Sequence, residues 1–484
     1  MKKLLFIIPA IAALGITSCR KIETDGEPII IQVPGGNTGG TQQGTTYNVR
    51  GTIKADSTLR AINQYIFTGP VVIDSGKTLT IEPGTTIKFA SSGSDVGYLV
   101  IARGAKIMAQ GTPEKPIVFT SNSARPMSGD WGGVVLCGKS SVNSTLNGQP
   151  NLIQVEGLQG LTGTQSYAGS GDNSPILNDN SGVLSYVRIE YAGYAYQPDK
   201  EINSLTLGAV GSGTTIDHVQ IALAKDDAIE WFGGTVNAKY LITYKTQDDD
   251  FDTDNGFSGK VQFGLIVRDS AIADISKSEA FESDNNSGGT TATPQTSAVF
   301  SNITAIGPRA TLSNVGNTLY LAGAQIRRNS SISIFNSVFL GWPTGLLIDA
   351  TTGRATDLNI ADSSLRIRYT TLAGNTTPLA YSPSAGNPTG FTTADLTTWF
   401  LNPAFQNKIL TNVADAKFIQ PFNYAAFDPT PFGGSSGNAD ILNNANFTDP
   451  KLAGGFFSTV TFRGAVAPAG VESTWWKGWS KFNY

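Results

Sequence analysis

The stretch Ile216-Asp217-His218-Val219-Gln220-Ile221 indicates the fold, because strings of the same kind return along the chain. They begin again at Leu184, Ala238, Val261, Phe300 and Ile334. Each is a short run rich in β-branched or aromatic residues, which is typical of a strand. Ile216 and Ala238 are 22 residues apart, and Ala238 and Val261 are 23 apart. This spacing suits one turn of a parallel β-solenoid, in which each strand stacks on its equivalent one turn below.

Earlier segments show the same pattern of short strand-forming runs. From Tyr47 onward, short apolar runs such as Val71-Val72-Ile73 and Leu99-Val100-Ile101 lie too close together for helical crossovers. We therefore predict an all-β solenoid over residues 47–375, with apolar ladders of inward side chains that include Ile242. Residues 376–484 lose the strand rhythm and are rich in Pro, Gly and Asn. We predict that they form an irregular C-terminal section that packs on the solenoid and covers a strand edge.

The N-terminus predicts export and lipidation. Lys2 and Lys3 precede an apolar run from Leu4 to Ile16, which is shorter than the roughly 20 residues needed to span a bilayer and fits a secretory signal. Ile16-Thr17-Ser18-Cys19 resembles a bacterial lipobox. We expect residues 1–18 to be a signal peptide, Cys19 to carry lipid, and residues 19–46 to be a flexible linker to an outer-membrane, cell-surface position. The alternative is an ordinary signal peptide with a chance cysteine.

Composition excludes several functions. The chain has 34 basic and 38 acidic residues and lacks a basic tract, which argues against nucleic acid as a partner. With Cys19 acylated, Cys137 has no disulfide partner and is expected to be a buried small hydrophobe. His218 is the only histidine, so a serine triad is disfavoured and a structural imidazole within a strand is expected.

One stretch is dense in carboxylates, Asp248-Asp249-Asp250-Phe251-Asp252-Thr253-Asp254. In an extended strand its even-numbered residues would share a face. Asp226 and Asp227 lie 22 residues before Asp248 and Asp249, which is one turn of the coil. Calcium is a suitable counter-ion because it binds several carboxylate oxygens. The predicted metal ligands are Asp226, Asp227, Asp248, Asp250, Asp252 and Asp254.

Other interpretations of these acids stay open. They could form a solvated edge that keeps the solenoid soluble, or a working active site. Glu230, Glu279, Glu282 and Asp284 could reach the same flank. An EF-hand is excluded, because counting from Asp250 places Asn255 at position 6 and Val261 at position 12, where Gly and Glu are required.

Trp231, Arg327 and Arg328 are candidate contacts for a ligand or partner. An exposed tryptophan could stack on a sugar ring, although aromatic residues also pad β-folds. The paired arginines could clamp an anion, and ion pairing with the nearby acids is the plainer interpretation. No catalytic residue is assigned from the sequence.

The segment Ser75-Gly76-Lys77-Thr78-Leu79-Thr80-Ile81-Glu82-Pro83-Gly84-Thr85 resembles the opening turns of right-handed, pectin-lyase-like β-helix proteins. Further stretches are similar to a largely uncharacterised family of Bacteroidota surface lipoproteins: Gly129-Asp130-Trp131-Gly132-Gly133-Val134, Ile229-Glu230-Trp231-Phe232-Gly233-Gly234 and Trp475-Trp476-Lys477-Gly478-Trp479. The resemblance runs from about residue 50 to the end. It implies a right-handed parallel β-helix and little about activity.

Three functional hypotheses follow. The first is a non-enzymatic binding or accessory lipoprotein on the cell surface, serving a TonB-dependent nutrient uptake receptor and with a glycan as a candidate ligand. The second is a calcium-dependent polysaccharide lyase or glycoside hydrolase, suggested by analogy of fold. The third is a structural protein of the cell envelope.

Overall fold

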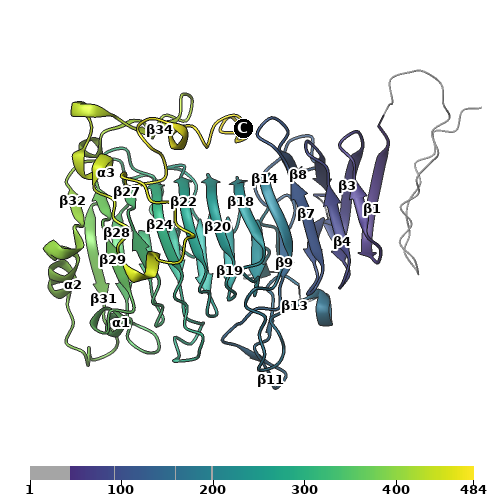
Figure 1. Cartoon of the computed structure of the whole chain (residues 1–484), viewed down its shortest axis with the longest axis horizontal. Helices are drawn as coiled ribbons and strands as arrows, with labels where there is room; N and C mark the ends of the chain where they lie inside the picture. Colours follow the sequence, from purple (N-terminus) through teal and green to yellow (C-terminus); the bar gives the residue numbers. More distant parts are fainter. Residues whose placement is uncertain (1–43, 92, 159, 198–199) are drawn as a thin grey trace, which may run out of the picture.

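The protein is an elongated parallel β-helix in a computed structural model that describes residues 44–484 except 92, 159, 198 and 199 (Figure 1). The predicted signal peptide, Cys19 and the linker up to residue 43 lie outside the described residues. The all-β, right-handed parallel β-helix predicted from the sequence is confirmed. Of the helices in the described part of the chain, none is both long and apolar enough to cross a membrane.

Each turn of the coil contributes to three parallel sheets, which we call faces 1, 2 and 3 in chain order. Face 1 consists of β1 (Thr46–Ile53), β3 (Gln64–Ile73), β5 (Thr86–Phe89), β8 (Ile117–Ser121), β14 (Gly182–Glu190), β18 (Thr215–Ala222), β20 (Asn237–Tyr244), β22 (Lys260–Val267), β24 (Val299–Ile306), β27 (Val338–Leu340), β30 (Thr371–Ala373) and β32 (Lys408–Leu410).

Face 2 shares β1 and β3 with face 1, because these two strands turn a corner. It continues with β6 (Tyr98–Ile101), β9 (Val134–Cys137), β17 (Leu205–Gly208), β19 (Ile229–Phe232), β21 (Phe251–Asp254), β23 (Phe281–Ser283), β25 (Ala322–Ile326), β28 (Thr344–Asp349) and β31 (Thr377–Ser382). This face carries the acidic residues.

Face 3 contains the first halves of the long strands β14, β18, β20, β22 and β24. Its other strands are β2 (Ser57–Leu59), β4 (Thr78–Ile81), β7 (Lys106–Gln110), β26 (Ser333–Phe335) and β29 (Arg366–Arg368). The long strands bend from face 3 into face 1 of the next turn.

The bend is made by one residue per turn in the left-handed region of the backbone. The bend residues have φ between 50° and 63° and are Tyr186, His218, Tyr240, Phe263, Asn302, Asn336 and Tyr369. His218 stacks between Tyr186 and Tyr240, with ring centroids 4.4 Å from each, and Tyr240 stacks on Phe263 at 5.0 Å. A left-handed backbone costs energy for any residue with a Cβ, and this stack of rings offsets part of that cost.

Two segments cover the outside of the coil. Residues 138–181 leave the coil after β9 and project from its side, as β11 and β13 show in Figure 1. We call them the excursion; its strands are β10 (Thr145–Leu146), β11 (Gln149–Pro150), β12 (Ile153–Gln154) and β13 (Tyr167–Ala168). Val142, Val155 and Leu158 of the excursion pack on outward residues of face 2 such as Val100 and Val135.

The C-terminal section runs back along the coil and covers the bend and face 1 (Figure 1). Side-chain amides on the coil act as partners for its backbone: Gln220 exchanges two hydrogen bonds with Lys481, at 2.6 and 2.8 Å, and Asn336 exchanges two with Asn446, at 3.1 and 2.8 Å. Beside short 3-10 turns, this section contains β33 (Phe418–Gln420), β34 (Asp428–Pro431) and α3 (Ala439–Asn443).

This cover corrects one sequence prediction. Ile242 was expected to point inward, but Leu241 occupies the interior, while Ile242 points outward and is buried beneath the C-terminal section with Phe462 and Trp475. The coil also continues past the predicted boundary at residue 375, since β31 and β32 complete its last turn. There α2 (Thr393–Phe400) packs Leu396 and Phe400 against the core. The shorter elements α1 (Asp357–Ala361), β15 (Ala195–Gln197) and β16 (Lys200–Glu201) lie in connections.

Candidate functional site

The outer surface of face 2 changes from apolar to acidic along the coil. One outward column, read through the strand register, contains Val72, Val100, Val135, Thr206, Glu230, Asp252, Glu282 and Gln325. The valines are covered by the excursion. Beyond its edge, three carboxylates stack on successive turns, about 4.8 Å apart in the stacking direction. The site therefore lies beside the excursion, on β19, β21 and β23.

A second column of acids lies in the turn that precedes these strands. Asp227 Oδ1 accepts a hydrogen bond from Asp249 N at 2.9 Å, and Asp249 Oδ1 accepts one from Glu279 N at 2.6 Å. Each carboxylate thus holds the backbone of the next turn. Asp226 and Asp248 flank this column, and Asp248 Oδ2 accepts a hydrogen bond from Ser276 Oγ at 2.8 Å.

The carboxylates of the two columns converge in three groups that we call the acidic cluster. Within each group, oxygen atoms from the three members lie within 4.8 Å of one another. The groups are Asp226, Asp227 and Asp248; Asp227, Glu230 and Asp252; and Asp249, Glu279 and Glu282. Oxygens that share one calcium ion lie less than about 5 Å apart, so each group fits part of such a coordination shell.

Burial makes the ionised state of the cluster costly. It raises the pKa of Asp252 to about 7, and the charge of Asp284 adds to the effect. It also raises the pKa of Asp248 to about 7. For Asp227 and Glu230, burial and then the neighbouring carboxylates raise the pKa well above the usual range. A cation would remove this cost by supplying the missing positive charge.

Some oxygens of the cluster have no hydrogen-bond partner among the described residues. They are Oδ1 of Asp252 and Oε1 of Glu279, and the Glu279 residue is only 2% exposed. A buried carboxylate oxygen without a partner is rare in proteins and calls for an explanation such as a bound ion. These two oxygens belong to two different groups of the cluster.

At the C-terminal end of the cluster, two arginines neutralise the carboxylates. Arg327 contacts Glu282 at 2.6 Å and Asp284 at 2.8 Å, and Arg328 contacts Asp284 at 2.6 Å. Burial lowers the pKa of Arg327, but the charges of Glu282 and Asp284 outweigh it and raise the pKa above its usual value. These arginines are therefore structural cations of the cluster, and Arg327 is unsuited to act as a base.

The structure divides the predicted ligands differently from the sequence. Asp226, Asp227, Asp248 and Asp252 lie in the cluster. Asp254 also points outward from face 2, but its oxygens accept hydrogen bonds from Asn255. Asp250 was predicted to share their face and does not, because the strand begins at Phe251 and the residue before it turns inward. Its carboxylate pairs with Arg268 inside the coil.

Sequence reasoning left Glu230, Asp249, Glu279 and Glu282 out of the ligand set. The signal for Glu230 was present, because it precedes Asp252 by 22 residues and therefore occupies the same place on the previous turn. The period of the sequence does not predict the positions of Glu279 and Glu282, because the connection between β22 and β23 lengthens that turn.

Trp231, a candidate contact for a ligand or partner, has no exposed surface. It points into the coil, is wholly buried, and stacks on Phe257 with ring centroids 5.2 Å apart. His218 is partly buried in the stack of rings at the bend, and its Nδ1 is hydrogen-bonded to Asp217. Cys137 is a free, fully buried cysteine beneath the excursion, where burial raises its pKa to about 12. None of the three is placed to act on a ligand.

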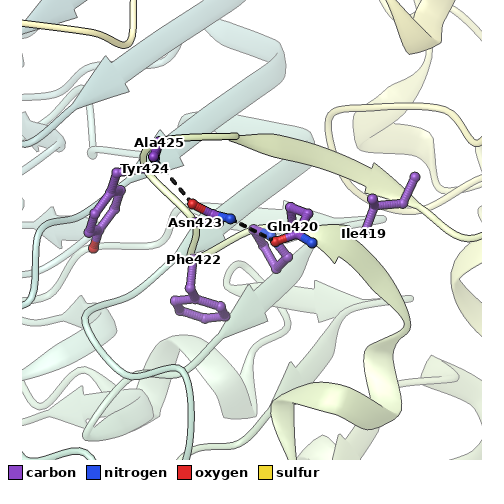
Figure 2. A pocket seen from close by; sticks show the side chains of 7 residues that line it. Ile419, Gln420, Phe422, Asn423, Tyr424 and Ala425 are labelled. Atoms are coloured by element: carbon purple, nitrogen blue, oxygen red, sulfur yellow. Dashed lines mark hydrogen bonds between the residues drawn. The ribbon is translucent and has the colours of Figure 1, made fainter.

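A surface hollow of about 660 Å³ lies at the loop between β33 and β34 and is lined by residues 419–425 (Figure 2). Its shape is set locally, since Asn423 hydrogen-bonds to Gln420 and to the backbone of Ala425. The Tyr424 hydroxyl donates to the carbonyl of Arg268 at 2.6 Å. The loop therefore fastens the C-terminal section to the coil.

Comparison with known proteins agrees with the architecture. The family of pectate-lyase-like β-helix domains matches residues 51–402, which include all three faces and the whole acidic cluster. No curated protein and no solved structure was found to match the chain. The match extends over most of the chain, and its limits follow the coil from β1 to the end of α2. The protein belongs to the family of pectate-lyase-like β-helix domains.

Proposed function

We propose that the protein is a calcium-binding, non-enzymatic surface protein, attached to the outer membrane through lipid on Cys19, that assists a nutrient uptake receptor. The observation that carries the calcium site is the convergence of eight acidic side chains into three groups, within each of which the oxygens lie within 4.8 Å of one another. Calcium takes six to eight oxygen ligands at about 2.3–2.6 Å, and carboxylates are its preferred donors. The buried oxygens of Asp252 and Glu279 that lack partners support the same site.

The arrangement favours binding over catalysis. A polysaccharide lyase on this fold would pair the calcium with a basic side chain that removes a proton. Arg327 and Arg328, which contact the cluster, are both held in ion pairs with Glu282 or Asp284. A calcium ion bound by the carboxylates that the arginines do not neutralise would hold three turns of the coil together. It would also bind an anionic partner.

A calcium titration tests the site. Because only the folded chain presents the cluster, calcium at about 100 times its Kd should add about 2.7 kcal/mol to the free energy of unfolding. Melting of the mature chain should therefore shift upward with millimolar calcium and downward with chelator. Unchanged melting in both would refute the calcium site and leave a solvated acidic edge.

A second experiment tests the partnership. Affinity purification from detergent-solubilised outer membranes should recover the same receptor repeatedly when the tagged protein is the bait. If no partner is recovered and uronate polysaccharides are cleaved to unsaturated, ultraviolet-absorbing products, the protein is a lyase and the proposal is wrong.

A further inference from the structure

A pair of cations that the acidic cluster does not use lies where face 2 turns toward face 3. Ser75, Arg103 and Lys139 directly follow the face 2 strands β3, β6 and β9, so they occupy successive turns of the coil. A Cβ built on Gly104 would lie 2.8 Å from Lys139 Nζ and 3.0 Å from Ser75 Oγ, which places these two groups beside the same turn. Within the described chain, neither Arg103 nor Lys139 forms an ion pair.

Contacts within and with the excursion fix the Arg103 side chain and the Lys139 backbone. Arg103 donates from its backbone N to Thr164 O and from Nη1 to Gly169 O, each at 2.9 Å. Lys139 accepts a hydrogen bond at its backbone O from Ile176 N, also at 2.9 Å. The bond to Gly169 uses one of the five N–H donors of the guanidinium group. The remaining donors and the Lys139 ammonium group are not committed to a carboxylate.

Between the coil and the excursion these contacts leave a cleft of about 310 Å³, large enough for a sugar unit. Arg103 and Lys139, which follow the face 2 strands β6 and β9, line it together with Thr164, Ser170 and Asp172 from the later part of the excursion. Asp172 is fixed, because its Oδ1 accepts a hydrogen bond from Ser174 N at 2.8 Å and its backbone O accepts one from Ser170 Oγ at 2.9 Å.

The chemistry of these two sets of residues differs. An arginine and a lysine that line the same cleft bind oxyanions through charge-assisted hydrogen bonds. A fixed carboxylate repels a bare anion and accepts hydrogen bonds from hydroxyl groups. A ligand that satisfies both sets must carry an oxyanion at one end and hydroxyl groups at the other.

We propose that this cleft binds an anionic saccharide unit, with its oxyanion on Arg103 and Lys139 and its hydroxyl groups on Asp172 and the neighbouring serine and threonine. The oxyanion is the carboxylate of a sugar acid or the phosphate of a sugar phosphate. The site is separate from the acidic cluster and needs no calcium. It gives the excursion a role in recognition beyond covering the valines of face 2.

Binding to the mature chain in the presence of chelator tests the proposal independently of the calcium site. The probes are glucuronic acid, mannose 6-phosphate, mannose and inorganic phosphate, each followed by calorimetry or ligand-detected NMR. One or both of the charged sugars should bind, and the stronger of the two identifies the oxyanion. Mannose and inorganic phosphate should bind at least about tenfold more weakly, because mannose lacks the oxyanion and inorganic phosphate lacks the sugar hydroxyl groups.

Matched variants locate the binding. Lys139→Gln removes the charge and leaves a polar side chain one bond shorter, and it should weaken the charged sugar about tenfold or more, the effect of losing one charge-assisted hydrogen bond. Asp172→Asn should weaken the charged sugar but not inorganic phosphate. Lys88→Gln, at an exposed position on face 1, is the control and should change nothing. The proposal is overturned if neither charged sugar binds, if phosphate binds as tightly as they do, or if Lys139→Gln with unchanged melting leaves affinity intact.

Discussion

Arg268 Nη1 lies 3.1 Å from Asp250 Oδ2 inside the coil, and both side chains are completely shielded from solvent. The guanidinium group also lies over the ring of Tyr320, 5.1 Å from its centroid. A charge in the interior of a β-helix is tolerated only with such partners. The pair explains why one aspartate of the acidic stretch has a structural role while its neighbours face outward.

Removing one partner of this pair should be strongly destabilising. Asp250→Asn leaves the Arg268 charge buried without a counter-ion, and we expect a loss of about 3–5 kcal/mol in the free energy of unfolding, measured by denaturant titration. Asp250→Leu combined with Arg268→Met should recover much of that loss. A cost below about 1 kcal/mol for Asp250→Asn would show that the pair contributes little.

Removing acids of the outward-facing cluster should stabilise the protein in the absence of calcium, whereas Asp250→Asn destabilises it. Glu230→Gln with Asp252→Asn removes two mutually repelling, buried charges, so the variant should melt higher than wild type in chelator. The same variant should lose most of the upward shift that calcium gives wild type. Glu114→Gln, an exposed acid outside the cluster, is the matched control. A full calcium response in the double variant would exclude this group as the ion's ligands.

The cluster should also give stability a characteristic pH dependence. The raised pKa values mean that the folded state binds more protons than the unfolded state between about pH 4 and pH 7. Without calcium, the stabilisation is therefore complete below about pH 4 and is lost as the pH rises through about 7. The difference between wild type and the Glu230→Gln, Asp252→Asn variant isolates this effect. With calcium in excess the trend should reverse, because the ion requires ionised carboxylates.

The bend stack predicts which substitutions of His218 are tolerated. Its backbone has φ 51°, and the same position on later turns is held by Asn302 and Asn336. His218→Asn should keep the bend and cost about 1 kcal/mol for the lost ring stacking. His218→Val should cost at least 1 kcal/mol more, because a β-branched residue strains a left-handed backbone. Equal melting of the two variants would mean that the bend does not depend on the residue placed there.

Lipidation at Cys19 has a direct biochemical test. Cys19→Ala should leave an unprocessed, unacylated precursor, and the protein should leave the membrane fraction in high salt. Metabolic labelling with a fatty-acid analogue should mark wild type only. Continued membrane attachment of the unlabelled variant would place the anchor elsewhere.

The coil could be predicted from the amino-acid sequence. Strand-forming runs at intervals of 22 and 23 residues can bury their apolar side chains only by stacking turn on turn, so period and alternation together specify a parallel β-helix. The stacking of Glu230 on Asp252 follows from the same arithmetic. The position of the acidic cluster could therefore be predicted from the sequence, and four of the six predicted ligands lie in the cluster.

Which side chains face one another could not be predicted in the same way, because it depends on how distant parts of the chain pack. Asp250 lies just before β21, where the strand alternation does not apply, and its side chain turns inward to Arg268, while Asp252 within the strand points out. Glu282 joins the cluster across a long connection whose length the period does not reveal. Ile242 is buried on the outside because a segment more than 200 residues later folds back over it. Contacts of this kind depend on where loops and the C-terminal section pack, which no local pattern encodes.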